Sequence, residues 1–550
     1  MNRITLYFLF LAANLNAQIL HVIRGPYLQS PGTNSMIIHW RTDSATTSRV
    51  TYGLNFGSSA FNAANAADST EHIVQLTGLT PLTKYYYTIG TNTQVLKGPD
   101  SLMYFTTAPT STAATPLRLW ATGCFGQGTT AQSLVRESYL NQIANTKPAD
   151  LWLWLGDNAY DDGTDVEYQT KVFDSIYGYQ RLFPNLPFAS TSGNREYNSI
   201  CPWQPNYCTQ DPNLHTGPYL DIIDPPCHGE LGGVASNLKI FYSFDYGDIH
   251  FVSLNSEIGS QTAAYDWLGI SDLDTTFTSP MIEWLKADLS ASTKKWKIAF
   301  WHQPPYSVHP LTTEYSPMSV AARGHFNPIL EQYGVDLVLS AHDHSYQRSY
   351  LINGHYGLRP SFTSAMRING TSGNDALGEA YVKYTDGALA NKGTVYVIEG
   401  NSASNSSYTP VADPAIYKAQ LCDTCIGSLF IDVDGNRLDA HFLSVYGGIV
   451  DQFTILKQST TGINDIAESE VLQIYPNPAN DKMFITYQAG SNNTLTKILV
   501  VDVTGKMVSQ FSAGDKHSIE WNTQSVANGM YIVRVESGSL SAYKRVSVIH

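Results

Sequence analysis

The sequence predicts a multidomain protein that consists of an N-terminal β-sandwich, a central α/β domain and a small C-terminal all-β sandwich. Short alternating strands separated by turn residues occupy residues 19–108, as in β-sandwiches. Across residues 117–457, apolar strand-like runs end in polar loops, as in open α/β folds. Residues 471–550 return to short strands. With 550 residues, 43% of them hydrophobic, the chain is large enough for several cores.

The N-terminus has the features of a signal peptide over residues 1–17. Arg3 precedes a mostly apolar stretch, and Leu15-Asn16-Ala17 provides a small-residue cleavage site before Gln18. No later stretch is long and apolar enough to span a bilayer. We therefore expect an exported protein, secreted or held at the cell surface after removal of the signal peptide, with no transmembrane helix.

The N-terminal sandwich is predicted from alternating runs such as residues 35–40 and 84–89. Residues 109–116 are rich in Thr, Ser and Ala, which indicates a linker to the central domain. A second polar stretch, residues 458–470, is expected to link the central and C-terminal domains.

Polar side chains follow several strand-like runs of the central domain. After successive runs the sequence places Asp157 and Tyr160, then Asn194, then His302, and finally His342 and His344. The carboxyl ends of strands in open α/β folds are where ligands bind. Imidazole is the commonest side-chain ligand for zinc and iron, and a carboxylate can bridge two cations. Together these residues predict a metal site, although a His-x-His pair alone is equally compatible with two hydrogen-bonded turn histidines.

The order of these motifs resembles the purple acid phosphatases of the metallophosphoesterase superfamily. Residues 156–160 match the family's GDxxY, Gly193-Asn194 the start of its GNH[DE], His302 its VxxH histidine, and residues 341–344 its GHxH with Ala in place of Gly. The resemblance implies a two-sheet β-sandwich flanked by helices and a centre of two metal ions, Fe³⁺ plus a divalent Fe, Zn or Mn ion.

Carried over residue by residue, the resemblance implies two sets of ligands around a bridging Asp157. Cys124, Tyr160 and His344 would complete one metal site, and Asn194, His302 and His342 the other. A thiolate and a phenolate together favour a trivalent ion in the first site.

Two positions depart from the family pattern. Cys124 stands where the family has the Asp of GDxG, as in the PhoD-type alkaline phosphatases. A thiolate is a good ligand for iron or zinc, but a buried structural thiol or half of a disulfide is the alternative. Arg195 replaces the family's substrate-contacting His; it can hold a phosphate oxygen but cannot donate a proton.

His309 is a candidate proton donor, with a solvent-exposed loop histidine as the alternative. His250 is expected to be a core histidine.

The predicted reaction is hydrolysis of phosphate monoesters by a metal-activated water. The alternative is a catalytically impaired phosphatase-fold surface protein with a binding or adhesive role. A net charge of -14 argues against nucleic acid as the main partner. The resemblance implies a small phosphate ester as the substrate.

The flanking domains carry resemblances of their own. Residues 24–28, 76–81 and 104–107 resemble the fibronectin type III-like domain that precedes purple acid phosphatase catalytic domains. Residues 475–478 and 528–531 resemble the C-terminal sorting domain of type IX secretion cargo. This implies the type IX secretion machinery as a partner, with a small adhesive sandwich as the alternative.

Six cysteines suit an exported protein, because disulfides persist outside the cytosol. The short spacings of Cys201 with Cys208, and of Cys422 with Cys425, predict two local bridges. Cys124 and Cys227 are then left over, and a disulfide between them would remove the proposed thiolate ligand.

Overall fold

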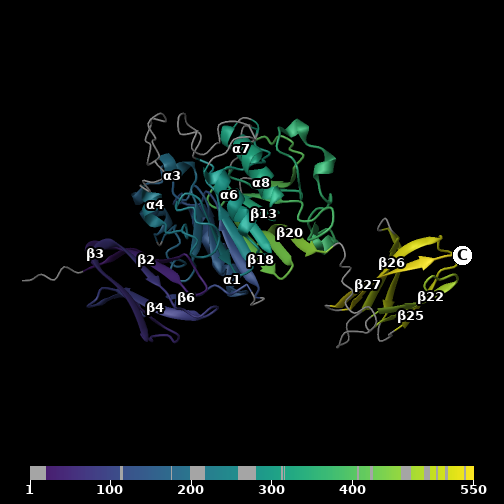
Figure 1. Cartoon of the computed structure of the whole chain (residues 1–550), viewed down its shortest axis with the longest axis horizontal. Helices are drawn as coiled ribbons and strands as arrows, with labels where there is room; N and C mark the ends of the chain where they lie inside the picture. The colour runs from purple at the N-terminus through teal and green to yellow at the C-terminus, as the bar shows by residue number, and fades with distance from the viewer. Residues whose placement is uncertain are drawn as a thin grey trace, which may run out of the picture. The chain divides into compact units, whose positions relative to one another are not determined.

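The computed structural model divides the chain into two compact units, residues 1–459 and 460–550 (Figure 1). The structure describes residues 20–111, 115–174, 176–198, 217–257, 280–310, 314, 316–405, 408–421, 425–459, 472–487, 496–502, 506–513, 518–537 and 540–550. The predicted signal peptide, Cys201, Cys208 and Cys422 lie outside these residues. Among the described residues, no helix has the length and apolar character needed to cross a membrane.

The N-terminal domain is a β-sandwich built around one long strand. Its strands are β1 (Val22–Gln29), β2 (Met36–Gly53), β3 (Phe61–Leu76), β4 (Lys84–Gly90), β5 (Val95–Lys97) and β6 (Tyr104–Thr106). The first part of β2 pairs with β1 and its last part with β4, and the register shifts between Arg41 and Ser48. Such irregularities bend a strand, so β2 can pair with β1 along its first part and with β4 along its last part. Trp40 of β2 is buried in the core of this domain.

The central domain contains two seven-stranded sheets. One has the order β10 (Tyr242–Tyr246), β11 (Ile249–Ser253), β12 (Trp296–Phe300), β13 (Leu337–Ser340), β16 (Val395–Glu399), β14 (Tyr346–Ser349), β17 (Ile416–Gln420). The other has the order β15 (Tyr381–Tyr384), β20 (Ile449–Gln458), β19 (Arg437–Ser444), β18 (Gly427–Asp434), β7 (Leu117–Thr122), β8 (Leu151–Leu155), β9 (Phe188–Thr191).

The candidate ligands therefore come from both sheets rather than from a single one. Strands β7, β8 and β9 run parallel in one sheet, while β12 and β13 run parallel in the other. The two sheets share an apolar core, to which β8 contributes Leu153 and β13 contributes Leu339. The polar loops still converge because both sets of strands end at the same edge of this core.

Helices α1 (Thr130–Ala144), α6 (Pro280–Ala291) and α8 (Asn327–Gln332) contribute buried residues to the core outside the sheets (Figure 1). The other described helices are α2 (Asp165–Glu167), α3 (Asn194–Asn198), α4 (Pro218–Ile222) and α7 (Pro317–Ala321), with π-helical turns η1 (Tyr168–Val172) and η4 (Ala322–Phe326) and 3₁₀ turns η5 (Arg359–Ser361), η6 (Ser364–Met366) and η7 (Asp375–Leu377).

Burial on both faces explains the continuous apolar sequence of β8. Its leucines point into the core between the sheets, whereas Trp152 and Trp154 point outward into the layer that contains Val135 and Tyr139 of α1. Strands that are covered on both sides lose the polar–apolar alternation of half-exposed strands.

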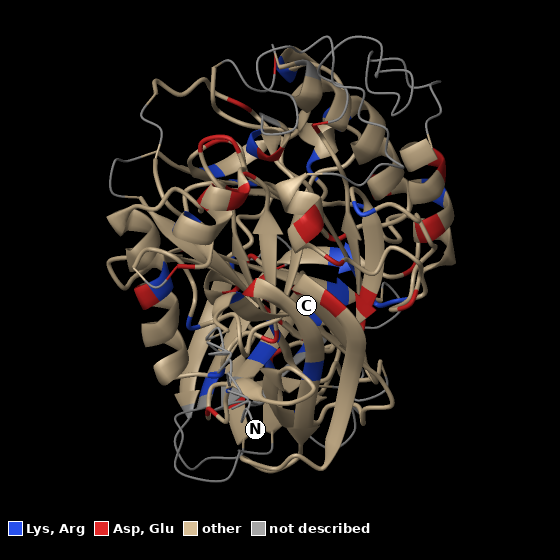
Figure 2. Ribbon diagram, turned by 90° about the vertical axis from the view of Figure 1, so that its left-hand side faces the viewer, with Lys and Arg blue, Asp and Glu red and all other residues tan. Residues whose placement is uncertain are grey.

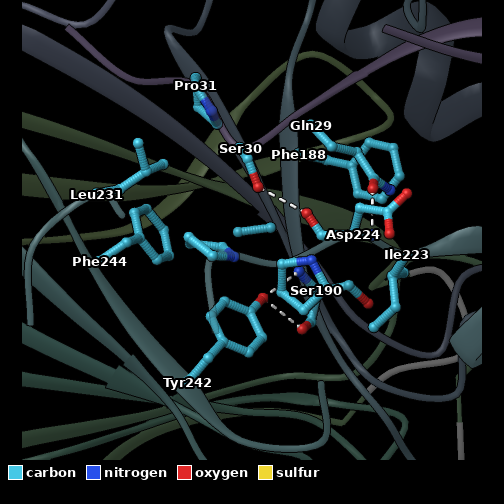
Figure 3. Close-up of a pocket in the computed structure, with 13 residues that line it drawn as sticks. Gln29, Ser30, Pro31, Phe188, Ser190, Ile223, Asp224, Leu231, Tyr242 and Phe244 are labelled. Carbon is cyan, nitrogen blue, oxygen red and sulfur yellow. Dashed lines mark hydrogen bonds between the residues drawn. The ribbon is translucent and has the colours of Figure 1, made fainter. Parts of the chain in front are cut away.

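The N-terminal domain packs against β9, the strand that leads to Asn194 (Figure 3). Ser30 of the N-terminal domain donates a 2.6 Å hydrogen bond to the carbonyl oxygen of Asp224 in the central domain. Within the central domain, Tyr242 donates a 2.7 Å hydrogen bond to the carbonyl oxygen of Ser190 in β9. The cavity between these residues measures about 20 Å³, which is room for one water molecule. This contact supports the strand and leaves no space for a substrate.

The C-terminal unit is all β, as predicted. One sheet has the order β21 (Leu472–Tyr475), β22 (Lys482–Tyr487), β25 (Ser518–Asn522), and the other β24 (Met507–Ala513), β23 (Thr496–Asp502), β26 (Gly529–Ser537), β27 (Leu540–Val548). Side chains such as Ile485, Trp521 and Val533 form its own core, so this unit is a domain separate from the one that carries the candidate ligands.

Candidate metal centre

The loops after five strands bring the predicted ligands together. Cys124 follows β7, Asp157 and Tyr160 follow β8, Asn194 follows β9, His302 follows β12, and His342 and His344 follow β13. The ligand atoms of Cys124, Asp157 and His302 all lie within 4.8 Å of one another. Hydrogen bonds connect the remaining residues to this cluster, as described below.

Three of these ligands have a left-handed backbone. Cys124, Asp157 and His342 have φ angles of 53°, 52° and 65°, a region that few residues other than Gly, Asn, Asp and His adopt, so Cys124 is the unusual one. Gly156, with φ of 88°, precedes the bridging carboxylate; a Cβ atom there would lie 2.6 Å from Nδ1 of His302. Strain of this kind is typical of functional sites, where the surrounding structure holds it in place.

Asp157 is the hub of the cluster. Its Oδ1 lies 3.3 Å from Nε2 of His302 and accepts a 2.9 Å hydrogen bond from the backbone N–H of Arg195. Its Oδ2 accepts a 2.9 Å hydrogen bond from the Tyr160 hydroxyl. Burial opposes ionisation of Asp157, but the charge and hydrogen bond of His302 outweigh it and hold the pKa of Asp157 well below its ordinary value. The residue is therefore a carboxylate with one oxygen toward each set of ligands.

Asn194, His302 and His342 form one set. Oδ1 of Asn194 lies 3.2 Å from Nε2 of His302 and 3.1 Å from Nδ1 of His342. The other nitrogen of His302 contacts the carbonyl oxygen of Leu155 at 2.9 Å. That oxygen can only accept, so Nδ1 of His302 carries a proton and Nε2 is turned toward Asn194 and Asp157.

The two histidines of this set titrate differently. Burial lowers the pKa of His302, but Asp157 overcomes this effect and raises it to about 9. Burial and the neighbouring His302 lower the pKa of His342 to about 3. If Nε2 of His302 held a cation, the proton that Asp157 stabilises there would have to leave.

Cys124, Tyr160 and His344 form the second set. The Tyr160 hydroxyl lies 3.1 Å from Nε2 of His344, and Nδ1 of His344 lies 2.9 Å from the Ser404 hydroxyl. Cys124 and Cys227 are both free and buried, which excludes the disulfide between them. Burial and the charge of Asp157 raise the pKa of the Cys124 thiol well above its ordinary value. The thiol is therefore protonated until a cation displaces the proton.

The donors in this cluster fit metal ions by their chemistry. They comprise oxygens of a carboxylate, an amide and a phenol, three imidazoles and a thiol, and each of the two sets holds three of them around the shared Asp157. Nitrogen and sulfur donors together with oxygen favour iron, zinc or similar ions over magnesium or calcium. The described residues thus place two groups of three candidate ligands around the Asp157 carboxylate.

The residues proposed for catalysis lie at the rim. The Arg195 guanidinium lies 5.1 Å from the centre of the Tyr160 ring, its Nε lies 3.9 Å from Oδ2 of Asp157, and its side chain is 36% exposed. His309 is partly buried, and its ring centre lies 4.3 Å from that of Tyr408. Its backbone is also held, because Arg359 donates a 3.1 Å hydrogen bond to its carbonyl oxygen.

His250 is a core histidine, as predicted. It is fully buried, and its two ring nitrogens lie 2.8 Å from carboxylate oxygens of Asp245 and Asp288. Cys425 is disulfide-bonded, but Cys422 lies outside the described residues, so their pairing stays a prediction.

Sequence reasoning missed two residues that hold the ligands. Ser404 contacts His344, and Glu196 accepts hydrogen bonds from the backbone beside Asp157. Glu196 was visible as the acidic residue after Asn194-Arg195, but its partners Asp157, Asn158 and Tyr168 are unpredictable because they lie 28 to 39 residues away in the chain. Ser404 had no signal in the sequence.

Comparisons with known protein families agree with this architecture. Residues 117–346 match the calcineurin-like phosphoesterases, residues 23–107 the purple acid phosphatase N-terminal domain, and residues 473–549 the secretion system C-terminal sorting domain. Figure 2 shows where the basic and acidic residues lie along the ribbon of the described chain, with both kinds present in the central part of the view.

Among characterised relatives, acid phosphatase type 7 of Danio rerio is 25% identical over 473 residues, which cover 78% of this chain and 90% of that protein. Purple acid phosphatase 15 of Arabidopsis thaliana is 27% identical over 301 residues, which cover 50% of this chain and 49% of that protein. The match thus spans most of the fish protein but about half of the plant one.

Two solved structures share the fold. Purple acid phosphatase PPD1 from yellow lupin (Lupinus luteus) seeds has a TM-score of 0.58 at 17% identity, covering 79% of this chain and 74% of that chain. The structure of PhoD has a TM-score of 0.55 at 13% identity, covering 80% of this chain and 92% of that chain. Over its central domain this chain therefore belongs to the calcineurin-like phosphoesterases of the purple acid phosphatase type, with the N-terminal domain of those phosphatases before it and a secretion system C-terminal sorting domain at the end.

Proposed function

We propose that this protein is an exported phosphatase that hydrolyses phosphate monoesters at a dinuclear metal centre. The observation that carries the proposal is the convergence of Cys124, Asp157 and His302, whose ligand atoms lie within 4.8 Å of one another at the end of the core. The names of the related acid phosphatases support the same class of reaction. The sorting domain supports export and transfer to the type IX secretion machinery.

Each set of ligands would hold one cation. Cys124, Tyr160 and His344 suit Fe³⁺, because thiolate and phenolate stabilise a trivalent ion, while Asn194, His302 and His342 suit a divalent Fe, Zn or Mn ion. Asp157 lies between the sets with one oxygen toward each. When bound, the two cations would acidify a water molecule, clamp the phosphoryl oxygens and neutralise the charge that develops on them.

Arg195 would bind the phosphate. Its guanidinium lies at the rim beside Asp157, and its Nε has no hydrogen-bond partner among the described residues. A guanidinium can hold two phosphate oxygens at once and offset the charge of the transition state. Arg195 does not supply a proton at neutral pH, so protonation of the leaving group requires another residue.

His309 is the residue that we assign to this proton transfer. It follows the same strand, β12, as His302, and it is the smallest of the causes that lower the pKa of His342. The ring contact with Tyr408 positions its side chain, and Arg359 holds its backbone, which favours a positioned residue over a freely moving loop histidine.

A test combines elemental analysis with hydrolysis of a generic aryl phosphate by the wild type and by Cys124→Ala. We expect two metals per chain in the wild type, with loss of one metal and of activity in the variant. Cys227→Ala is the matched control, since Cys227 is also free and buried but is not part of the cluster. A wild type that binds no metal and shows no turnover across pH would instead indicate a surface protein with a binding or adhesive role.

A further inference from the structure

The Glu196 carboxylate lies directly behind the proposed metal ligands. The residue is 1% exposed and follows Asn194 by two positions. Its Oε2 accepts hydrogen bonds from the backbone N–H groups of Gly193 at 2.6 Å and Asp157 at 3.0 Å. Its Oε1 accepts hydrogen bonds from the backbone N–H of Asn158 at 2.8 Å and the Tyr168 hydroxyl at 3.0 Å.

These hydrogen bonds join two loops that come from different strands. Asp157 and Asn158 belong to the turn after β8, whereas Gly193 and Glu196 belong to the loop after β9. The loops are tied in the opposite direction as well, because the backbone N–H of Arg195 donates to Oδ1 of Asp157. The Glu196 side chain therefore binds the backbone of the loop after β8, and the Asp157 side chain binds the backbone of the loop after β9.

The backbone of Asp157 is held by these hydrogen bonds. Its φ of 52° is left-handed, a conformation that Asp adopts more readily than most residues. The Asp157 N–H is one of the groups that Glu196 binds, so the carboxylate acts directly on the backbone of this residue. Burial makes these hydrogen bonds stronger than they would be in water.

We infer that Glu196 is a positioning residue that fixes the bridging carboxylate of Asp157 relative to Asn194, and thereby sets how tightly both cations are held. The inference rests on the proposed function, because it concerns the same metal centre. Removal of a residue that hydrogen-bonds to metal ligands typically lowers metal affinity by about 10–100-fold.

Tyr168 provides a matched control. It donates to the same carboxylate, but from the π-helical turn η1 rather than from a ligand loop. Tyr168→Phe removes this donor and leaves the hydrogen bonds from the backbone N–H groups of Gly193, Asp157, Asn158 and Ala159 intact. If Glu196 acts through the backbone of the ligand loops, Tyr168→Phe has little effect on metal binding.

Glu196→Gln and Glu196→Asp separate charge from geometry. Glutamine keeps the size of the side chain but places an NH₂ group against backbone N–H groups. Aspartate keeps the charge but withdraws the carboxylate by one methylene. A positioning role requires that both variants bind metal more weakly.

The experiment measures retention of the metals by the full-length protein during dialysis against a graded series of chelator concentrations. We expect both Glu196 variants to lose metal at concentrations about 10–100-fold lower than the wild type, and Tyr168→Phe within about threefold of it. Thermal unfolding in excess chelator reports the stability of the metal-free fold. If Glu196→Gln fails to fold, Glu196→Asp decides the matter.

Three results would overturn the inference. In the first, both Glu196 variants retain metal as well as the wild type does. In the second, only Glu196→Asp retains it, which would assign the effect to the charge of the side chain. In the third, Tyr168→Phe loses metal as readily as the Glu196 variants do. If the wild type binds two metals, any of these three results contradicts the role of Glu196 but not the proposed function. If the wild type binds no metal, the role of Glu196 and the proposed function are both contradicted.

Discussion

The Tyr160 hydroxyl donates a 2.9 Å hydrogen bond to Oδ2 of Asp157, three residues earlier in the same turn. The same hydroxyl lies 3.1 Å from Nε2 of His344, which comes from the other sheet. The phenol thus connects the bridging carboxylate to the histidine of the set that contains Cys124. This geometry leads to the first prediction.

We expect Tyr160→Phe to weaken metal binding at that set by at least about tenfold, because the phenol oxygen is lost while Asp157 and His344 stay. Elemental analysis after dialysis measures the effect. Tyr179→Phe is the control: the Tyr179 hydroxyl is buried and has no hydrogen-bond partner among the described residues, so its removal is expected to cost no stability. Unchanged metal content in Tyr160→Phe would remove Tyr160 from the ligands.

Arg195 is expected to contribute to substrate binding through its forked guanidinium. Arg195→Lys keeps the positive charge but loses the two-pronged contact, so we expect KM for an aryl phosphate to rise about tenfold, and further in Arg195→Ala. Steady-state kinetics measure the change. Arg181→Ala, at an exposed arginine outside the cluster, serves as the control. A KM that stays constant in Arg195→Ala would contradict the assignment.

His309 is expected to matter most for poor leaving groups, which need a proton as they depart. In His309→Gln we expect kcat/KM to fall about 100-fold for an alkyl phosphate and less than about tenfold for nitrophenyl phosphate. The ratio of the two substrates is the informative measurement, because loss of structure lowers both equally. His228→Gln alters an exposed histidine and controls for general effects. Equal losses for both substrates would argue against proton donation by His309.

His250 is expected to make stability depend on pH. Burial lowers its pKa, but its hydrogen bonds with Asp245 and Asp288 outweigh burial and raise the pKa above the ordinary value. The folded protein therefore binds this proton more tightly than the unfolded chain does. Its contribution to stability is fully present below the unfolded pKa of about 6.5 and is lost as the pH rises through the folded pKa.

The variant His250→Gln tests this dependence. The difference in unfolding free energy between wild type and variant is expected to shrink as the pH rises from about 6 to about 9, as measured by urea unfolding followed through tryptophan fluorescence. His228→Gln, at an exposed histidine, is expected to show no such trend. If this difference in unfolding free energy stays constant over the pH range, His250 does not bind its proton more tightly in the folded protein than in the unfolded chain.

Local sequence was enough to find most of the candidate site. Asp157, Asn194, His302 and His342 each lie just after an apolar strand, and the strand itself carries the residue to the edge of the core. Periodicity likewise identified His250 as a core residue, since its neighbours alternate along a buried strand. These features depend on residues close in the chain, which is why they can be recognised without the fold.

Pairings between distant residues were decided by the tertiary structure. The sequence left open whether Cys124 bonds to Cys227, and only the fold shows both thiols to be free. It also gave no sign that Glu196 binds the backbone of Asp157, 39 residues earlier. Strand ends follow from local patterns of burial, but contacts between loops depend on how the sheets pack, and that packing is a property of the whole core.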